Sequence, residues 1–343
     1  MTAASTDTLL EVKDLHVHFP RAKKGWFQPA EVVRAVDGLS FSIQRGTTLA
    51  LVGESGSGKT TTALAVTRLT PLTSGQIQLG ELDLGQLEGE ALREARRRFQ
   101  FIFQDPFSSL NPRERAGAVV RAPLDLMNVG TPEQRTERVA ALFKAVGLRP
   151  EHQNLFPHQF SGGQRQRINI ARALATEPEL VVCDEPVSAL DIAIRAQILN
   201  LLVRLQRELG LTYLFISHDM AVVEHICDEI AVMYLGQIIE RAPRQAFFAN
   251  PLHPYSVALM SAVPTVTGGR KRAAQRIKLS GDPPSPINPP PGCRFSSRCP
   301  VAEPACSQAA PPLREIAPNH WVQCRRVDVV DGRIQTPLSF PSL

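Results

Sequence analysis

The run Gly53-Glu-Ser-Gly-Ser-Gly58-Lys59-Thr60 has the residue types and spacing of a phosphate-binding loop, G-x-x-x-x-G-K-[ST]. Its glycines let successive backbone N–H groups turn inward around a polyphosphate, and the N-terminus of a following helix adds positive potential. Lys59 would neutralise the β- and γ-phosphates, and the hydroxyl of Thr60 would bind Mg²⁺. The alternative is a glycine-rich turn without a ligand, which a flanking strand and helix argue against.

Two adjacent carboxylates, Asp184 and Glu185, follow the apolar run Leu180-Val-Val-Cys183. A buried strand that ends in a carboxylate can complete the Mg²⁺ shell of a phosphate loop. Asp184 would face the metal through water, and Glu185 would polarise the water that attacks the γ-phosphate. Taken alone, such a pair is more often a solvated strand end, but together with the loop it predicts a phosphoryl-transfer site.

The elements around these residues have the pattern that such chemistry needs. The apolar run 48–52 leads into the loop, and helix-compatible spacing follows from Thr60 to Leu69. Two further apolar runs, 179–184 and 212–217, are separated by a predicted helix over 193–209. This alternation is typical of a buried parallel sheet in an α/β core.

The remaining patterns predict a more varied set of elements. Residues 9–19 and 35–43 alternate apolar and polar side chains as antiparallel strands do, and the insertion 20–32, which contains Trp26 and Phe27, predicts a surface hairpin or loop. We also expect a charged helix over 88–99, a strand over 99–104, mostly helix over 105–175, and strands over 229–235 and 236–240.

Composition limits the class of protein. The 343 residues carry 38 Lys+Arg and 33 Asp+Glu, a net charge of +5, and 43% are hydrophobic, which excludes disorder over most of the chain. No apolar run is long enough to span a bilayer, and the start Met1-Thr-Ala-Ala-Ser lacks the basic and apolar regions of a signal peptide. We therefore expect a soluble chain in the cytoplasm. The small basic excess suits an anionic ligand or membrane surface and lacks the clustered stripe of a duplex-binding protein, but charge alone does not exclude nucleic acid. Together with the motifs described below, it leads us to expect no nucleic-acid partner.

Further motifs resemble those of ATP-binding cassette (ABC) ATPases. Phe160-Ser-Gly-Gly-Gln-Arg-Gln-Arg167 is similar to the family's signature motif. Gln104 resembles its Q-loop glutamine, Ser188-Ala-Leu-Asp191 its D-loop, and His218 its switch histidine. With the phosphate loop and the Asp184-Glu185 pair, these motifs stand in the family's order. The resemblance covers about residues 9–260.

The resemblance implies a site for ATP and Mg²⁺ and a role for each matching residue. Glu185, His218, Gln104 and Lys59 would be catalytic, and Mg²⁺ would be held through Thr60, Gln104 and Asp184. The predicted ATP contacts are Phe19, Gly53, Glu54, Ser55, Gly56, Ser57, Gly58, Lys59, Thr60, Thr61, Gln104, Asp184, Glu185 and His218. Phe19 matches the aromatic position that stacks on adenine in the family, although the insertion with Trp26 and Phe27 leaves that alignment ambiguous.

In cassette dimers each ATP lies between the phosphate loop of one subunit and the signature motif of the other. The resemblance therefore implies that a partner's ATP is contacted by Ser161, Gly162, Gly163, Gln164 and Asp191. A Ser-Gly-Gly turn before a helix also suits an anion physically, because the helix N-terminus offers free N–H donors. Taken alone it would more often be an ordinary helix cap, and a histidine such as His218 at the end of a strand would more often be structural.

Three segments outside these motifs resemble ATPases of oligopeptide and dipeptide importers. They are the run 103–113, the tract Asn250-Pro-Leu-His-Pro-Tyr-Ser-Val-Ala-Leu-Met260 and the Cys/Pro-rich tail, and the N-terminal insertion is most similar to the F-type ATPase of such systems. The resemblance implies two transmembrane permease subunits, a second ABC ATPase subunit (a paralogue or an identical chain), an extracytoplasmic solute-binding protein, and a peripheral place on the cytoplasmic face of the inner membrane. Nickel, glutathione and some sugar importers share these features, so the solute stays open.

Four of the six cysteines gather in the tail: Cys293, Cys299, Cys306 and Cys324, with gaps of five, six and seventeen residues. In a reducing compartment, clustered thiols are more often metal or cluster ligands than disulfides. Four thiolates suit either a [4Fe–4S] cluster or a tetrahedral zinc, and the wide spacing with adjacent prolines allows loops to wrap a cubane. The absence of any metal is the third possibility. The tail also resembles the C-terminal region of peptide-importer ATPases, some of which hold such a cluster.

We therefore predict an α/β fold: a P-loop NTPase of ABC nucleotide-binding type over residues 9–264, with a mixed sheet core, an antiparallel β edge and a helical subdomain at about 105–175. An irregular Cys/Pro-rich extension would follow over residues 265–343. Because 11 of the 28 prolines fall between Pro283 and Pro318, we expect no backbone ladder to hold this extension.

Two other functions are considered. The first is a soluble ABC ATPase that acts in DNA repair or on ribosomes, but repair types carry a long coiled-coil insertion and ribosomal types usually a second cassette, and neither is seen here. The second is a regulatory iron–sulfur protein with a vestigial ATPase site, and the intact motifs argue against it.

Overall fold

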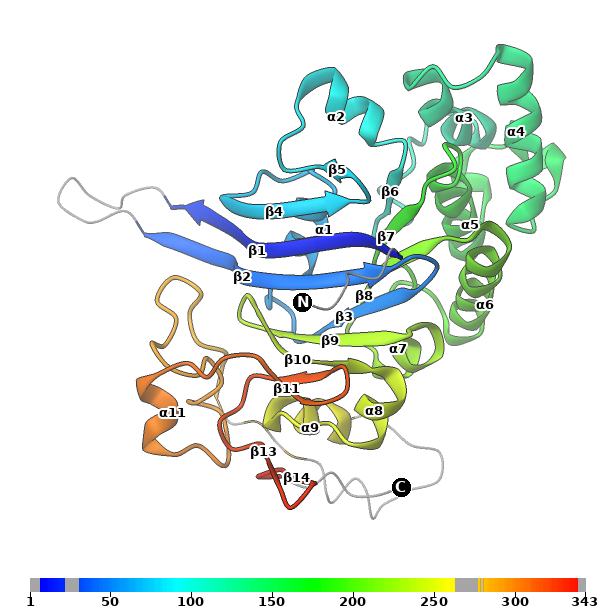
Figure 1. Cartoon of the computed structure of the whole chain (residues 1–343). Helices are drawn as coiled ribbons and strands as arrows, with labels where there is room; N and C mark the ends of the chain where they lie inside the picture. Colours follow the sequence, from blue (N-terminus) through cyan, green and yellow to red (C-terminus); the bar gives the residue numbers. More distant parts are fainter. Residues whose placement is uncertain (1–6, 22–30, 263–276, 278, 280, 339–343) are drawn as a thin grey trace.

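The computed structural model describes all residues except 1–6, 22–30, 263–276, 278, 280 and 339–343. The insertion with Trp26 and Phe27 and the expected domain boundary near residue 265 lie outside the described residues. An eight-stranded mixed sheet in the order β11-β12-β10-β9-β3-β8-β7-β6 forms the centre (Figure 1). Its strands are β3 (Thr48–Val52), β6 (Phe99–Ile102), β7 (Leu180–Asp184), β8 (Thr212–Ser217), β9 (Glu229–Tyr234), β10 (Gln237–Pro243), β11 (Arg314–Ala317) and β12 (His320–Val322).

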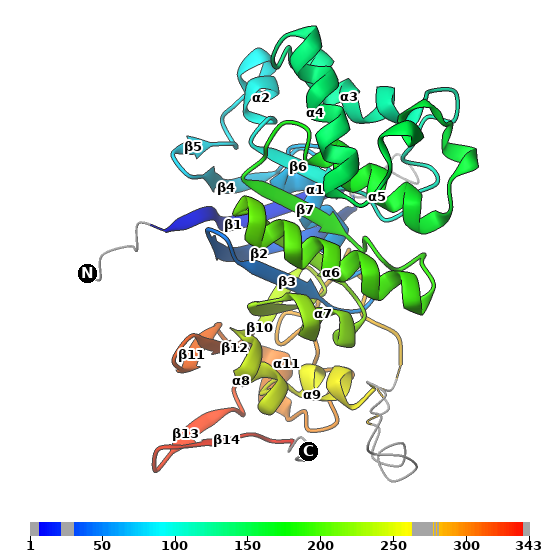
Figure 2. The same ribbon diagram turned by 90° about the vertical axis from the view of Figure 1, so that its right-hand side faces the viewer.

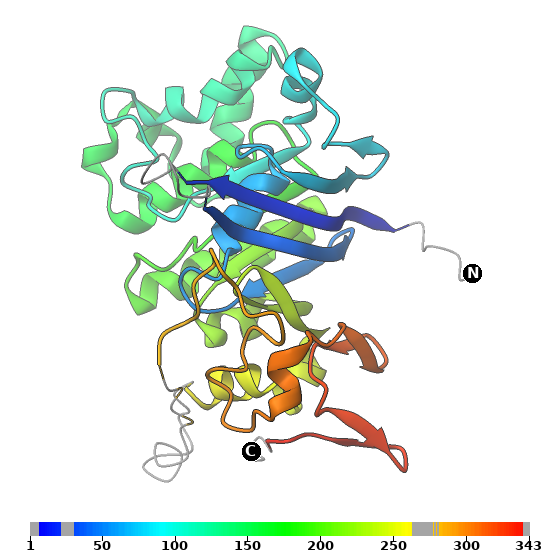
Figure 3. The same cartoon turned by 90° about the vertical axis from the view of Figure 1, so that its left-hand side faces the viewer.

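A second, antiparallel sheet has the order β2-β1-β4-β5 and covers one side of the central sheet (Figure 3). It contains β1 (Thr8–Pro20), β2 (Val32–Gln44), β4 (Ser74–Leu79) and β5 (Leu82–Asp83). Helix α1 (Lys59–Val66) lies between the two sheets, and its alanines share one apolar core with β1, β2 and β3. The antiparallel edge predicted from the alternating side chains is confirmed.

Helices cover the other face of the central sheet, as Figure 2 shows for α6 and α7. The mostly helical stretch expected over 105–175 begins only at Ala116: residues 105–115 form turns, and residues 116–173 form a largely helical block against this face. The helices are α2 (Gly89–Ala95), α3 (Ala116–Leu126), α4 (Pro132–Ala145), α5 (Gly162–Ala173), α6 (Ile192–Leu209), α7 (Met220–Ile226), α8 (Arg244–Ala249), α9 (Pro254–Ser261) and α11 (Pro304–Gln308), with 3₁₀ turns at Pro150–Asn154 and Pro157–Gln159.

Several predicted boundaries are wrong by a few residues. α1 ends at Val66 rather than Leu69, because the Thr67 hydroxyl bonds to the carbonyl of Ala63 and Arg68 takes a positive φ of 52°. α2 is seven residues long, shorter than the helix expected over 88–99. β6 stops at Ile102, since its pairing with β7 ends there, and Gln104 therefore stands beyond the sheet.

The expectation that no backbone ladder holds the tail is also wrong. β12 pairs antiparallel with β10, and β11 pairs with β12, so the tail extends the central sheet by two strands. These short strands fit between Pro312 and Pro318 and after Pro318, where every residue keeps its N–H. A separate hairpin is formed by β13 (Asp328–Val330) and β14 (Arg333–Gln335). No helix in the described part of the chain is long and apolar enough to cross a membrane.

Candidate nucleotide site

The phosphate loop joins β3 to α1, the local structure that the sequence predicted. Gly58, at the N-cap of α1, has a φ of 106°, and a Cβ there would lie 2.2 Å from the carbonyl oxygen of Ala35. Gly53 has a φ of 152°, and a Cβ there would lie 2.2 Å from the carbonyl oxygen of Met233. Neither position therefore tolerates a side chain. The loop is held tightly against β2 and β9.

Lys59 is buried and closes the loop from inside. Its Nζ donates to the carbonyl oxygens of Gly53 at 2.8 Å and Glu54 at 2.9 Å. Burial lowers the pKa of Lys59, and the neighbouring carboxylates of Glu185, Asp184 and Glu54 oppose that shift. The nearby carboxylates thus favour the protonated amine, whose charge suits a phosphate.

Thr60 and Asp184 meet where Mg²⁺ would bind. The Thr60 hydroxyl donates to Asp184 Oδ1 at 3.2 Å. Burial raises the pKa of Asp184, and the negative charge of Glu185 acts in the same direction, while the Thr60 bond and Lys59 oppose it. A divalent cation would favour the ionised carboxylate, and a hydroxyl beside a carboxylate is a donor set that Mg²⁺ prefers. The residues therefore fit the metal.

Glu185 stands at the centre of the expected catalytic residues. Its Oε2 accepts from Gln104 Nε2 at 3.0 Å, and its Oε1 lies 2.8 Å from His218 Nδ1. Glu185 has a positive φ of 46°, which is strained for a residue with a side chain, and its N–H donates to the carbonyl of Ile216 at 3.0 Å. The strained backbone is thus tied to β8 and orients the carboxylate.

A cavity of about 260 Å³ contains most of these groups. The predicted residues that line it are Ser55, Gly56, Gly58, Lys59, Thr60, Thr61, Gln104 and Glu185. The cavity is also lined by Val33, Arg34, Ala35, Leu235, Gly236 and Pro286, which no motif indicated. Phe19 does not line this cavity; it lies 42% exposed on β1, paired with Val33 of β2.

The signature residues Ser161 to Gln164 do not line this cavity. Ser161 caps α5 in a reciprocal capping box, in which its Oγ accepts from the N–H of Gln164 at 3.3 Å and Gln164 Oε1 accepts from the N–H of Ser161 at 3.0 Å. A Cβ at Gly163 would lie 2.4 Å from Cγ2 of Ile194, so α5 and α6 pack closely there. Gly162 and Asp191 also stand outside the cavity lining, and Asp191 is the N-cap of α6.

Comparisons with known proteins agree with this geometry. Residues 36–188 match the ABC transporter family, and residues 239–306 match the C-terminal region of oligopeptide/dipeptide transporters. The oligopeptide transport ATP-binding protein AppF of Bacillus subtilis is 49% identical over 94% of this chain and 99% of its own length. The chain belongs to the ABC transporter ATPase family. The dipeptide transport ATP-binding protein DppF of Escherichia coli is 48% identical over 93% of this chain and 95% of its own length.

Solved ABC cassettes share the fold. A dimeric cassette, MJ0796, bound to ADP and phosphate after hydrolysis, has a TM-score of 0.61 and 29% identity over 69% of this chain and 99% of that chain. CbiO1 from Clostridium perfringens, part of an ABC transporter complex, has a TM-score of 0.61 and 27% identity over 71% of this chain and 91% of that chain. The predicted ABC fold is therefore confirmed, and the chain is an ABC ATPase for which ATP and Mg²⁺ are the expected ligands.

The four tail cysteines line a single cavity at the base of the extension. Burial raises the pKa of Cys299 to about 11, and it raises those of Cys293 and Cys324 in the same direction. Backbone N–H groups oppose this rise in pKa. Those of Phe295 and Ser296 lower the pKa of Cys293, that of Val301 lowers the pKa of Cys299, and those of Arg326 and Val327 lower the pKa of Cys324. Such donors stabilise a thiolate once a metal has displaced its proton.

One other group of potential metal ligands occurs among the described residues. Atoms of His16, His18 and Asp37 lie within 4.8 Å of one another. Asp37 also forms an ion pair with Arg294, and Arg34 Nη1 lies 3.8 Å from its carboxylate. These guanidinium groups already supply positive charge to Asp37, so the group is better described as an ion-pair network than as a metal site.

Proposed function

We propose that this chain is the ATP-hydrolysing subunit that energises an ABC importer for oligopeptides or dipeptides. The observation that carries the proposal is the meeting of Glu185, Gln104 and His218 beside the phosphate loop, in a chain that resembles peptide-transport ATP-binding proteins over nearly its whole length. Lys59 and Mg²⁺ would neutralise the triphosphate, Glu185 would polarise the attacking water, and His218 would hold the γ-phosphate. Import of nickel, glutathione or another solute is the alternative for the same machinery.

A second cassette, identical or paralogous, would complete the site. Ser161, Gly163 and Asp191 of this chain would contact the ATP of the partner, and the corresponding residues of the partner would contact the ATP of this chain. The N-terminus of α5 supports this role, because the capping box uses the N–H groups of Ser161 and Gln164 and leaves those of the two glycines between them for an anion. Phe19 is proposed as the adenine platform because it lies across from Val33 of the cavity wall. The cassette would span residues 9–264 and the extension residues 265–343.

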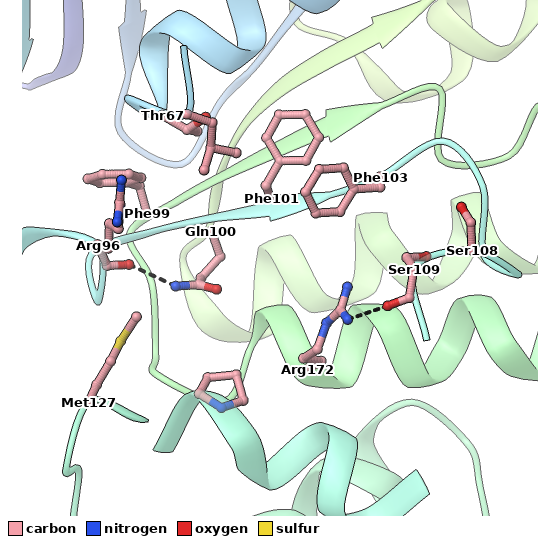
Figure 4. Close-up of a pocket in the computed structure, with 12 residues that line it drawn as sticks. Thr67, Arg96, Phe99, Gln100, Phe101, Phe103, Ser108, Ser109, Met127 and Arg172 are labelled. Carbon is pink, nitrogen blue, oxygen red and sulfur yellow. Dashed lines mark hydrogen bonds between the residues drawn. The ribbon is translucent and has the colours of Figure 1, made fainter. Parts of the chain in front are cut away.

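We propose a groove beside the Q-loop as the docking place of a permease. The groove has a volume of about 520 Å³ and is lined by Thr67, Leu69, Arg96, Phe99, Gln100, Phe101, Phe103, Ser108, Ser109, Pro123, Met127 and Arg172 (Figure 4). Phe103 is 41% exposed and precedes Gln104, while Arg172 of α5 donates to the carbonyl of Ser109 at 2.6 Å. A short amphipathic helix of a permease would bury its apolar face here. This permease helix would thereby contact both the segment that contains Gln104 and α5, the helix that starts at the signature motif.

Replacing Phe103 by aspartate tests the importer role and the groove together. In cells whose own copy is deleted, wild-type chain should restore uptake of a labelled dipeptide or tripeptide, and Phe103→Asp should reduce the restored uptake at least about tenfold, the effect of losing a central interface contact. ATP binding should persist, because Phe103 does not line the nucleotide cavity.

Leu126→Asp is the matched control, since Leu126 is 66% exposed on α3 but does not line the groove. Its uptake should equal that of the wild type. Peptide uptake that does not depend on the chain contradicts the importer role, and equal uptake by Phe103→Asp contradicts the groove. The permeases, the solute-binding protein and the location at the cytoplasmic face of the inner membrane all follow from the importer role and are part of the proposal.

We further propose that Cys293, Cys299, Cys306 and Cys324 hold a [4Fe–4S] cluster. All four line one cavity, yet no three of their sulfurs lie within 4.8 Å of one another in the described chain. A single zinc with Zn–S bonds of about 2.3 Å would need a tighter group, whereas a cubane binds each thiolate at a separate corner. Arg325 and Arg326 also line the cavity and would offset the negative charge of the cluster and its thiolates. The cluster would tie the extension together.

Metal analysis after anaerobic purification tests this assignment. We expect about four iron and four sulfide per chain, and we expect Cys299→Ser to lose most of both. Cys183→Ala is the control, because Cys183 is buried in β7, in an apolar core that contains none of the tail cysteines, and its loss should leave the content unchanged. Zinc without sulfide, or no metal at all, would contradict the cluster.

A further inference from the structure

The cysteine-rich extension contacts the back of the phosphate loop through Arg298, which directly precedes Cys299. Arg298 Nη1 donates to Glu54 Oε2 at 2.7 Å, and its Nη2 donates to Glu54 Oε1 at 3.2 Å. The arginine side chain is only 7% exposed. A two-pronged contact of this kind fixes the position of a carboxylate as well as neutralising it.

Glu54 connects this contact to Lys59. The backbone N–H of Glu54 donates to the hydroxyl of Tyr255 at 2.8 Å, and its carbonyl accepts from Lys59 Nζ at 2.9 Å. The side chain, N–H and carbonyl of one residue are thus each held by a different part of the fold. Movement of Glu54 would displace a carbonyl that orients the lysine.

The segment that carries Arg298 is itself firmly seated. Phe295 is 1% exposed, and its ring centroid lies 5.3 Å from that of Tyr234 and 5.4 Å from that of Tyr255. Arg294 bonds to Asp37 and to the carbonyl of Leu235. Gly236, the residue after Leu235, donates its N–H to the carbonyl of Ser57 in the phosphate loop at 2.9 Å. The extension therefore approaches the loop from two sides.

We propose that Arg298 is a positioning residue for ATP binding, acting through Glu54. It would hold Glu54 so that the carbonyls around Lys59 keep their places, and it would cancel the negative charge of Glu54 next to the triphosphate. Without Arg298, the free carboxylate of Glu54 would repel ATP and draw Lys59 away from the phosphates. The segment between Cys293 and Cys299 would then serve the nucleotide site directly, besides holding the extension together.

Equilibrium binding of MgATP to the full chain tests this inference, in a Glu185→Gln background so that ATP is not consumed. We expect Arg298→Ala to weaken ATP binding about tenfold, the effect of losing one charged hydrogen-bonded contact. Glu54→Gln alone completes the double-mutant cycle, because the amide removes the charge that Arg298 neutralises. Added to Arg298→Ala, Glu54→Gln should restore most of the lost affinity. General loosening of the extension would not produce such a rescue.

Arg314→Ala is the matched control, because Arg314 bonds to the carbonyls of Cys324 and Val327 and to Asp328, all within the extension. Its ATP affinity should equal that of the Glu185→Gln parent. Unchanged affinity in Arg298→Ala, failure of Glu54→Gln to rescue it, or an equal loss in Arg314→Ala would each overturn the inference. If Arg298→Ala does not fold, Arg298→Lys carries the same test: we expect weaker binding that Glu54→Gln restores, and unchanged binding would overturn the inference.

This inference rests on the proposed role of the phosphate loop in holding ATP, and the experiment separates the two. A Glu185→Gln parent that binds no ATP contradicts the nucleotide site itself. A parent that binds ATP, with the same affinity when Arg298 is replaced, contradicts only the positioning role.

Discussion

Replacing Glu185 by glutamine is expected to slow ATP hydrolysis at least about a hundredfold while ATP still binds, the usual loss when a general base is removed. Glutamine has nearly the same shape and keeps an oxygen that can accept from Gln104 or face His218, but it cannot take a proton from water. Because the contacts to the triphosphate come from the phosphate loop, they should survive the change. Single-turnover hydrolysis and ATP retention, measured on the same sample, check both expectations.

Glu94→Gln is the matched control for this change. Glu94 lies on α2 with its side chain 65% exposed and paired with Arg97, away from the nucleotide cavity. Its hydrolysis rate should equal that of the wild type. Substantial hydrolysis by Glu185→Gln would refute the role given to Glu185, and loss of ATP binding would show that the carboxylate has a structural part in the loop.

Replacing Lys59 by alanine should instead impair ATP binding itself, by at least about tenfold, because a buried charged donor to the phosphates is lost. The change also leaves the carbonyls of Gly53 and Glu54 without their donor. Titration with MgATP measures the affinity, and a melting curve without nucleotide shows whether the fold is kept.

Lys144→Ala removes an exposed lysine near the end of α4 and serves as the control for the lost charge. Its affinity for ATP should be that of the wild type. Normal ATP binding by a folded Lys59→Ala protein would contradict the assignment of the phosphate loop. The two variants therefore separate binding from hydrolysis: Lys59 is required to bind ATP, and Glu185 is required to cleave it.

The nucleotide site was largely predictable because its residues follow strand ends and turns with fixed spacing. A phosphate loop such as Gly53 to Thr60 must follow a strand and lead into a helix. β3 and α1 form at these places, with the turn between them. Asp184 ends β7, and His218 directly follows β8, which pairs with β7 in parallel. Two residues far apart in the sequence are therefore brought to the same edge of the sheet. Their assigned roles follow from the family resemblance and the geometry together.

Residues that join the site from other parts of the chain were not predictable. Pro286 lines the cavity, and Arg298 binds Glu54 although 244 positions separate them in the sequence. Neither residue belongs to a pattern of spacing, because tertiary packing alone brings them there. Nor does the proline content of the whole tail predict its strands, because a strand needs only a few residues with free N–H groups, as in His320–Val322.

ATP hydrolysis by the chain with and without co-purified permease subunits tests the importer role most directly. In lipid nanodiscs, hydrolysis by the assembled complex should exceed that of the isolated chain and rise further when peptide-loaded binding protein is added, because permease contact at the groove would be transmitted through the segment of Gln104. Full activity of the isolated chain, unchanged by permeases, binding protein or peptide, would contradict the importer role and favour an ABC ATPase that works outside a transporter.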